Sequence, residues 1–212
     1  IIVLDTNILL VPFDTNEKNF IDIKNIYLNY KAQNRLFIPA RVAREFANNR
    51  ANKIGDVFLQ VRQLKDNLNS GNFKINQYPI LDNNNDYKEL IRIFSSIQTE
   101  IKESRKHLEN IENHIQSWTW NDIVSIAYKE IFTPDIIVEV QKSKKEIEEE
   151  FAFRIEYKIA PGFKDSKKID DGIGDFVIWQ TLLEIARKNC KNLIFVTNDQ
   201  KNDWFYKQDK IG

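Results

Sequence analysis

The sequence predicts an α/β fold in which a central parallel sheet is flanked by helices and carries a long helical insertion. Two continuous apolar runs, at residues 1–4 and 193–196, are typical of strands that are buried on both faces of a parallel sheet. Stretches with apolar residues three and four positions apart lie between these runs. Strands that alternate with such helical patterns indicate a parallel sheet covered by helices on both faces.

The first third of the chain predicts two strands and two helices. The opening strand ends in a polar turn at residues 5–7, and apolar residues within 18–33 recur at the spacing of an amphipathic helix. A second short buried strand is expected at 36–38, where it is stopped by Pro39. A long helix is expected to follow, with an apolar stripe that continues to Leu68.

The middle of the chain has a different pattern, which indicates helices that pack against helices. Apolar residues step by three and four from Leu90 to Ile115, which is the spacing of a heptad seam. A further helix is expected to open at Pro134 and to continue to Ile155. Residues 86–150 are therefore predicted to be a helical insertion within a single domain that spans 1–212. The charge run from Lys142 to Glu150 is interpreted as a solvated helix face with ion pairs between neighbouring turns.

Composition excludes several classes of protein. The 212 residues include 31 Lys and Arg against 31 Asp and Glu, which excludes a globally basic protein that wraps nucleic acid but not a local basic face. Hydrophobic residues make up 42%, which is enough for a sizeable core and excludes a disordered chain. One cysteine and two histidines do not supply the ligands of a typical zinc site.

We expect a cytoplasmic protein without a membrane span. No apolar run reaches the ~20 residues that a membrane helix needs, and no signal peptide opens the sequence. The single cysteine fits a reducing compartment. The sequence contains no methionine and begins directly in a strand-like run, so it is expected to be a segment of a longer protein.

Acidic side chains follow the first and the last of the predicted strands. Asp5 and Asp199 lie in the similar segments IVLDTN and IFVTND. In open parallel sheets, ligands bind in the crevice beyond the carboxyl ends of the strands. Two carboxylates in that crevice repel each other unless a cation lies between them. Oxygen ligands without histidine or thiolate favour Mg²⁺ or Mn²⁺.

Three further acids are candidates for the same site. Glu45 lies in the second turn of the helix after the second strand, Asp175 begins an apolar helix, and Asp203 follows Asp199 by four residues. Each acid alone has a simpler interpretation: a solvated helix residue for Glu45, a helix cap for Asp175, and turn formation for Asp5 and Asp199. The coincidence of four acids at one edge of one sheet favours a metal site, with Asp203 as an auxiliary acid.

The sequence resembles the PIN-like domain family, and in particular a larger bacterial branch in which a helical insertion precedes a PGxKD loop. The resemblance spans nearly the whole chain apart from the insertion, and its motifs occur in the family's order. It rests on VLDTN at 3–7, VAREF at 42–46, APGFKDSKK at 160–168, GDFVIW at 174–179 and VTNDQKNDW at 196–204.

The resemblance implies a PIN nuclease fold and hydrolysis of phosphodiester bonds, usually in RNA, with the help of Mg²⁺ or Mn²⁺. A bound divalent ion would lower the pKa of the attacking water, orient it and stabilise the leaving oxygen. The acids that the resemblance implies as catalytic and metal-binding are Asp5, Glu45, Asp175 and Asp199, with Asp203 beside them. The residues that it implies as orienting groups around these acids are Thr6, Asn7, Thr197 and Asn198.

Basic residues near the acids are candidates for contacts with phosphate groups, which attract a nucleic acid without reading its bases. An ordinary solvated surface is the alternative interpretation. The candidates are Lys164, Lys167 and Lys168 before Asp175, and Arg41, Arg44 and Arg50 near Glu45.

Three functions stay open at this point. RNA is the favoured substrate and nucleic acid the expected partner, but the same chemistry on DNA is an alternative because an acidic centre does not select the sugar. A non-catalytic PIN-like module that binds a partner through its helical insertion is the third. A homodimer is a further expectation, since many PIN domains pair.

Overall fold

The computed structural model describes residues 1–212 except 70, 72, 74, 164–171, 201–203 and 205–212. The chain divides into two units, one formed by Ile1–Ala51 with Asp122–Gly212 and the other by Asn52–Asn121. The second unit overlaps the predicted insertion at residues 86–121. Residues 122–150 belong to the first unit.

The first unit is built on a parallel sheet, which confirms the α/β fold class. Its strands have the order β3-β2-β1-β4, and all three pairings are parallel. Val3 of β1 lies opposite Phe37 of β2 and Phe195 of β4, so the first and last strands of the chain are neighbours. The strands are β1 (Ile2–Leu4), β2 (Leu36–Pro39), β3 (Ile137–Val138) and β4 (Ile194–Val196).

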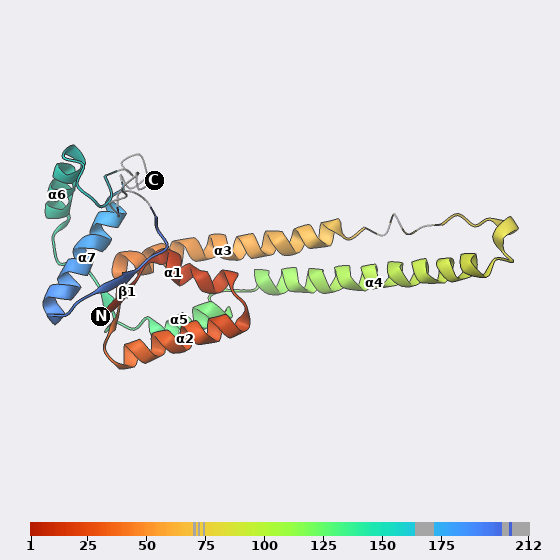
Figure 1. Ribbon diagram of the computed structural model, residues 1–212, viewed down its shortest axis with the longest axis horizontal. Helices are drawn as coiled ribbons and strands as arrows, with labels where there is room; N and C mark the ends of the chain where they lie inside the picture. Colours follow the sequence, from red (N-terminus) through yellow and green to blue (C-terminus); the bar gives the residue numbers. More distant parts are fainter. Residues whose placement is uncertain (70, 72, 74, 164–171, 201–203, 205–212) are drawn as a thin grey trace, which may run out of the picture. The chain divides into compact units, whose positions relative to one another are not determined.

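Helices flank this sheet (Figure 1). The main core cluster joins the strands to several helices, and its fully buried members include Val3, Ile38 and Val42. A smaller cluster around Phe151 and Phe176, whose ring centroids are 5.6 Å apart, fastens α6 to α7. The helices of this unit are α1 (Thr6–Leu10), the 3-10 helix η1 (Val11–Asp14), α2 (Glu17–Ala32), α5 (Ile123–Ile131), α6 (Lys144–Glu156) and α7 (Ile173–Asn189), together with the first part of α3 (Ala40–Asn67).

The second unit contains the remainder of α3, the 3-10 helix η2 (Pro79–Leu81) and α4 (Asn85–Gln116). The side chain of Asn84 caps α4, as Asn commonly does at a helix N-terminus. Arg105 Nη1 of α4 donates to the carbonyl oxygen of Leu68, just after α3, at 2.7 Å. This contact and the Lys65–Glu112 ion pair join α4 to the end of α3, but Leu90 and Ile111 of the predicted seam are exposed, so packing along the whole seam stays a prediction. Among the helices that the structure describes, none has both the length and the apolar character needed to cross a bilayer.

The prediction of a helix from Pro134 to Ile155 is wrong for the residues before Lys144. Ile137 and Val138 instead form β3 on the outer edge of β2, with Ile137 opposite Ile38. β-Branched residues favour such an edge, where they pack against the neighbouring strand. α6 begins only at Lys144, because Ser143 and Glu146 form a reciprocal capping box.

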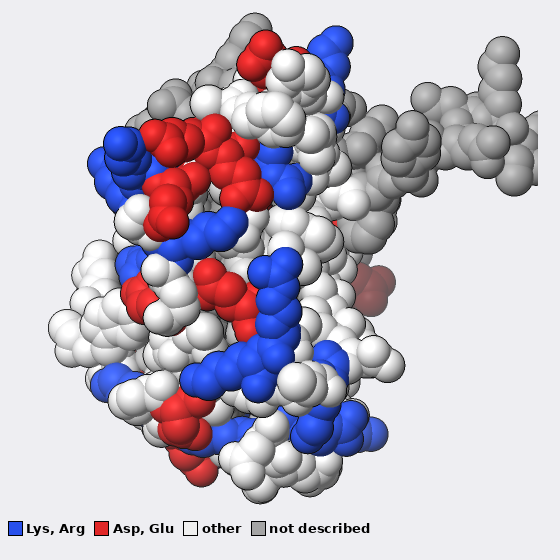
Figure 2. Space-filling view, turned by 90° about the vertical axis from the view of Figure 1, so that its left-hand side faces the viewer, with Lys and Arg blue, Asp and Glu red and all other residues white. Residues whose placement is uncertain are grey.

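The charge run on α6 follows the predicted pattern of paired near neighbours. Lys144 lies 3.6 Å from Glu148, and Lys145 lies 3.8 Å from Glu149. On the face that Figure 2 shows, acidic and basic side chains lie beside one another. This surface is a mixed, solvated one and not a uniform basic field.

Candidate active site

The candidate site lies at the carboxyl edge of the sheet, between β1 and β4. The chain passes from β1 to β2 on one side, whereas β4 lies on the other side of β1. Such a reversal of strand order is where open α/β sheets bind their ligands. The amide of Asp5 donates to the carbonyl oxygen of Val196 at 3.0 Å, so the two strand ends stay paired up to the first acid.

Asp5 is held by three hydrogen bonds. Its Oδ1 accepts from the amide of Thr6 at 2.7 Å and thereby caps α1. Its Oδ2 accepts from Thr197 Oγ1 at 2.6 Å and from Asn7 Nδ2 at 2.9 Å. Since the donors come from both strand ends, the orientation of the carboxylate is fixed only when β1 and β4 are paired.

The segment after β4 is tied to the segment after β1 by further polar contacts. The amide of Asn198 donates to Asn7 Oδ1 at 2.9 Å, and the amide of Asp199 donates to Thr197 Oγ1 at 2.9 Å. Asn7 Nδ2 also donates to Thr197 Oγ1, at 3.1 Å. The structure thus gathers around Asp5 the polar residues that the resemblance implies as orienting groups.

Glu45 reaches this edge from α3. Its Oε2 accepts from Thr6 Oγ1 at 2.9 Å, and its Oε1 accepts from Arg41 Nε at 2.6 Å. The hydroxyl of Thr6 therefore links the helix after β1 to the helix after β2. Arg41, a sequence candidate for a phosphate contact, lies beside an acid and offsets part of its charge.

Asp175 lies in the first turn of α7, but the residue at the N-cap is Gly172, and no side chain forms a hydrogen bond that caps the helix. The interpretation of Asp175 as the cap is therefore wrong, although an acid in the first turn still favours the helix dipole. A Cβ at Gly174 would lie 2.8 Å from Arg41 Nη2 and 3.1 Å from Glu45 Oε1. This close approach brings the first turn of α7 against the Arg41–Glu45 pair.

The charges at this edge interact. Burial raises the pKa of Asp5, and the negative charges of Glu45 and Asp199 raise it further, while hydrogen bonds from Thr197 and Thr6 act in the opposite direction. The net direction is upward, so the ionised form of Asp5 is disfavoured as long as no cation is present. A divalent ion would offset both the cost of burying the Asp5 carboxylate and its repulsion by Glu45 and Asp199.

The donor set fits a hard divalent cation in kind, because it consists of carboxylate, hydroxyl and amide oxygens. Over the described ranges, however, no three Asp, Glu, His or Cys side chains form a ready-made metal-binding group. The carboxylate of Glu45 is instead engaged by Arg41. The remaining candidates fall outside the described residues; they are Asp203, Lys164, Lys167 and Lys168.

Two other arginines have structural partners. Arg44 pairs with Glu139, its Nη1 lying 2.5 Å from Oε1, and both side chains are exposed. Arg50 is buried, where it forms an ion pair with Asp122 and donates to Ser125 Oγ at 2.5 Å. The expectation that Arg50 flanks the cleft is therefore wrong, because its guanidinium is part of the core.

Glu139 is an acid that the sequence interpretation missed. It directly follows β3, so it lies at the carboxyl edge of the same sheet. The run Ile136-Ile137-Val138 before it resembles Ile1-Ile2-Val3 before Leu4-Asp5, and this similarity was the available signal. The apolar residues that follow have helical spacing, and for this reason the run was interpreted as the start of a helix.

Gly162, in the loop before α7, occupies a position that requires glycine. Its φ is +93°, and a Cβ there would lie 3.2 Å from the carbonyl oxygen of Gly172 and 3.3 Å from Phe151 Cε2. We expect Gly162→Ala to lower the free energy of unfolding by about 1–3 kcal/mol, because both the backbone and the packing are strained. Urea denaturation followed by circular dichroism measures this change.

A matched glycine variant serves as the control. Gly55 lies inside α3 and a Cβ there would meet nothing within 4 Å. Gly55→Ala is expected to raise the free energy of unfolding by about 0.5–1 kcal/mol, because alanine favours a helix. If the two variants shift stability in the same direction, the argument for strain at Gly162 fails.

Comparison with known families gives a match that extends over almost the whole chain. A family model described as a PIN like domain matches residues 1–211. No curated protein and no solved structure matches the chain. The matched region includes both strand-end segments and the second unit between them.

Proposed function

The chain belongs to the PIN-like domain family, and from this membership and the acidic sheet edge we propose that it is a Mg²⁺- or Mn²⁺-dependent nuclease that hydrolyses RNA. Family membership points to the nuclease superfamily in general. The observation that carries the finer proposal is the convergence of acidic segments at the reversal of strand order. Thr6, next to Asp5, donates to Glu45, and Thr197 Oγ1 donates to Asp5 and accepts from the amide of Asp199. A site that concentrates negative charge in this way favours a divalent cation.

The residues proposed to hold the ion are Asp5, Asp175 and Asp199, with Glu45 near a second position and Asp203 as an auxiliary acid. When bound, the ion supplies a water of lowered pKa and stabilises the charge that develops on the phosphate. The protein's own contribution is orientation. Thr197 and Asn7 fix the carboxylate of Asp5, and Thr6 fixes that of Glu45.

Arginine and lysine side chains are proposed to bind the phosphates that flank the cleaved bond. Arg41 is the described cation that lies against the acids, and Gly174 leaves room for its guanidinium. Arg44 lies one turn along α3 from it, beside Glu139. Lys164, Lys167 and Lys168 are proposed for the same role on the basis of their place in the sequence before Asp175.

The purified chain is expected to cut labelled single-stranded RNA in Mn²⁺ and to stop when the ion is removed with EDTA, because the reaction depends on the bound cation. Gel analysis of the products measures this. Mn²⁺ is also expected to raise the melting temperature of the protein, since a ligand that binds only the folded state stabilises it by about 2.7 kcal/mol at 100 times its Kd. Cleavage that persists in EDTA would contradict the proposal.

DNA and partner binding are the alternative outcomes of the same assay. Parallel RNA and DNA strands of one sequence decide which sugar is accepted. The Arg41–Glu45 ion pair favours the alternative of a non-catalytic module, because it engages an acid proposed to lie near the ion. If the protein cuts neither strand and Mn²⁺ leaves its melting temperature unchanged, this alternative replaces the nuclease.

A further inference from the structure

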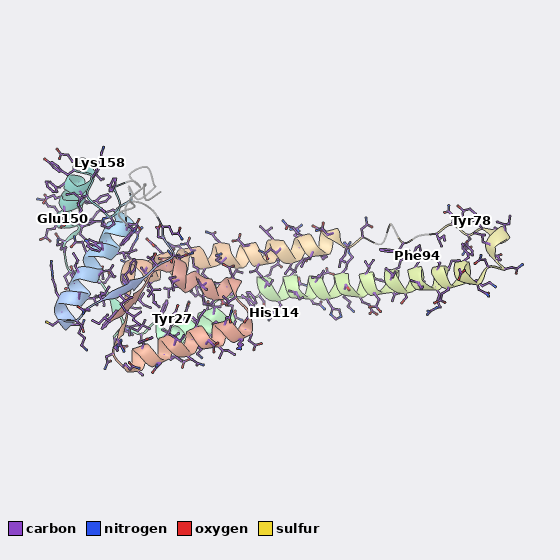
Figure 3. The ribbon with its side chains drawn as sticks, viewed as in Figure 1. Tyr27, Tyr78, Phe94, His114, Glu150 and Lys158 are labelled. Atoms are coloured by element: carbon purple, nitrogen blue, oxygen red, sulfur yellow. The ribbon has the colours of Figure 1, made fainter. Side chains whose placement is uncertain are left out.

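The unit Asn52–Asn121 contains a groove whose charged lining residues are mostly cationic. The groove has a volume of about 680 Å³ and lies between the end of α3 and the middle of α4. In Figure 3, Phe94 and His114 mark two positions on α4, and the groove residues of this helix lie between them in sequence. Four of the lining residues are Lys65, Lys102, Arg105 and Lys106, whereas the only lining acid among the described residues is Glu109.

Three of these cations have no carboxylate partner within the described part of the chain. Lys65 forms an ion pair with the buried Glu112. For Lys102, Arg105 and Lys106, no described Asp or Glu oxygen lies within 4 Å. Elsewhere on α4 a cation does have such a partner, since Arg92 lies 2.7 Å from Glu89.

The arrangement of the three cations is fixed by α4 and by the end of α3. Lys102 and Lys106 are four residues apart, so their side chains emerge on the same face of the helix. The guanidinium of Arg105 is held at the groove by its hydrogen bond to the Leu68 carbonyl oxygen. Like charges at this spacing destabilise a helix, and a bound anion would offset that cost.

The chemistry of the groove favours a polymer with repeated phosphates. The formal net charge of the whole chain is zero, so this surplus of positive charge is local. Leu68 and Ile101 supply apolar contacts, and Gln98 and Asn69 supply amide groups. Cations that bind a phosphate backbone provide affinity without reading the base sequence.

We infer that this groove binds the backbone of the nucleic acid that the protein cleaves, and so supplies substrate affinity from a part of the chain separate from the acidic residues. The inference rests on the proposed function for the identity of the ligand. Each backbone contact releases counterions, so binding through the groove weakens as salt rises.

The test compares two double variants of α4 in the full chain. Lys102→Gln with Lys106→Gln removes two groove cations, whereas Lys88→Gln with Arg92→Gln removes two cations at the same spacing outside the groove. Arg105 is left in place because it also binds the Leu68 carbonyl oxygen. Fluorescence anisotropy measures the Kd of a labelled single-stranded RNA in EDTA, over a series of salt concentrations.

The groove variant is expected to raise the Kd by about 10-fold and to reduce the slope of log K against log[salt] by about 1.4, which is 0.7 for each lost contact on a single strand. The control variant is expected to leave both unchanged. Circular dichroism checks that the two variants are equally folded. Equal losses in both variants, or no loss in the groove variant, would overturn the inference.

The outcomes separate this inference from the proposed nuclease activity. Groove-dependent RNA binding without cleavage in Mn²⁺ would overturn the nuclease and leave the groove as a nucleic-acid site. Cleavage of RNA by a protein whose Kd is unchanged in the groove variant would overturn the inference about the groove and leave the nuclease proposal in place. Tighter binding of an acidic peptide than of RNA or DNA would assign the groove to a protein partner and overturn the inference.

Discussion

Asp5→Asn is expected to reduce Mn²⁺-dependent cleavage of RNA by at least about 10³-fold, which corresponds to about 4 kcal/mol of transition-state stabilisation. The substitution removes the negative charge that would balance the ion. It also replaces one oxygen with an amide nitrogen, so the contacts from Thr197 and Asn7 to Oδ2 cannot both be kept. Single-turnover kinetics at saturating Mn²⁺ measure the loss.

The controls for Asp5→Asn address folding and general charge. Asparagine is as good an N-cap as aspartate, so the contact to the Thr6 amide and the start of α1 are expected to remain. Asp22→Asn, at an exposed position in α2, makes the same chemical change away from the site and is expected to cleave at the wild-type rate. Cleavage by Asp5→Asn within about 10-fold of wild type would remove Asp5 from the catalytic machinery.

Arg50→Ala is expected to lower the free energy of unfolding by about 3–5 kcal/mol, because it leaves a buried carboxylate without its counter-charge. Arg50 and Asp122 are 6% and 4% exposed, and the Arg50 guanidinium contacts both Asp122 and Ser125. Asp122 also caps α5 through the amide of Ser125. Urea denaturation of the variant and the wild type measures the difference.

The effect of Arg50→Ala is expected to depend on pH. Burial raises the pKa of Asp122, but hydrogen bonds from Ser125 and from Arg50 outweigh it, and the pKa lies below 3.8 in the folded protein. An acid with a lowered pKa stabilises the fold above its unfolded value and loses that contribution as the pH falls through the folded value. The difference between the wild type and Arg50→Ala is therefore expected to narrow as the pH falls toward the lowered pKa of Asp122 in the wild type.

Two further variants test the cause. Arg44 lies on α3, as Arg50 does, and forms an exposed ion pair with Glu139. Arg44→Ala breaks this pair and is expected to lower the free energy of unfolding by no more than about 1 kcal/mol. Arg50→Met combined with Asp122→Asn removes both charges and keeps the cap, so it is expected to recover most of the lost stability. If Arg50→Ala lowers the free energy of unfolding no more than Arg44→Ala does, the buried ion pair does not stabilise the fold.

Local sequence patterns were sufficient to predict the centre of the fold. β1 and β4 are continuous apolar runs, and strands buried on both faces of a parallel sheet have this composition. Because parallel strands place their carboxyl ends at one edge, the same runs also predicted that Asp5 and Asp199 lie close together. The structure links the two residues through Thr197, whose hydroxyl donates to Asp5 and accepts from the amide of Asp199.

Contacts between distant residues limited the prediction elsewhere. The two residues of β3 form a strand because β2 offers an open edge, and their short β-branched run was not enough to distinguish them from the helical spacing that follows. The capping box of Ser143 and Glu146 was a usable signal for where α6 begins. Arg50 and Asp122 are 72 positions apart, so their pairing depends on the fold itself. The spacing of Arg41 and Glu45 allows a pair, but only the packing of Gly174 places that pair against α7.

The pairing of β1 with β4 has a consequence during synthesis of the protein. Asp5 leaves the ribosome well before Thr197, because the hydroxyl that orients its carboxylate lies 192 positions later in the chain. Contacts of such long range form late, since the loop between them must close first. A nascent chain therefore carries Asp5 and Glu45 without the hydrogen bonds that arrange them, and the proposed hydrolytic centre is assembled only after the segment that follows β4 has been synthesised.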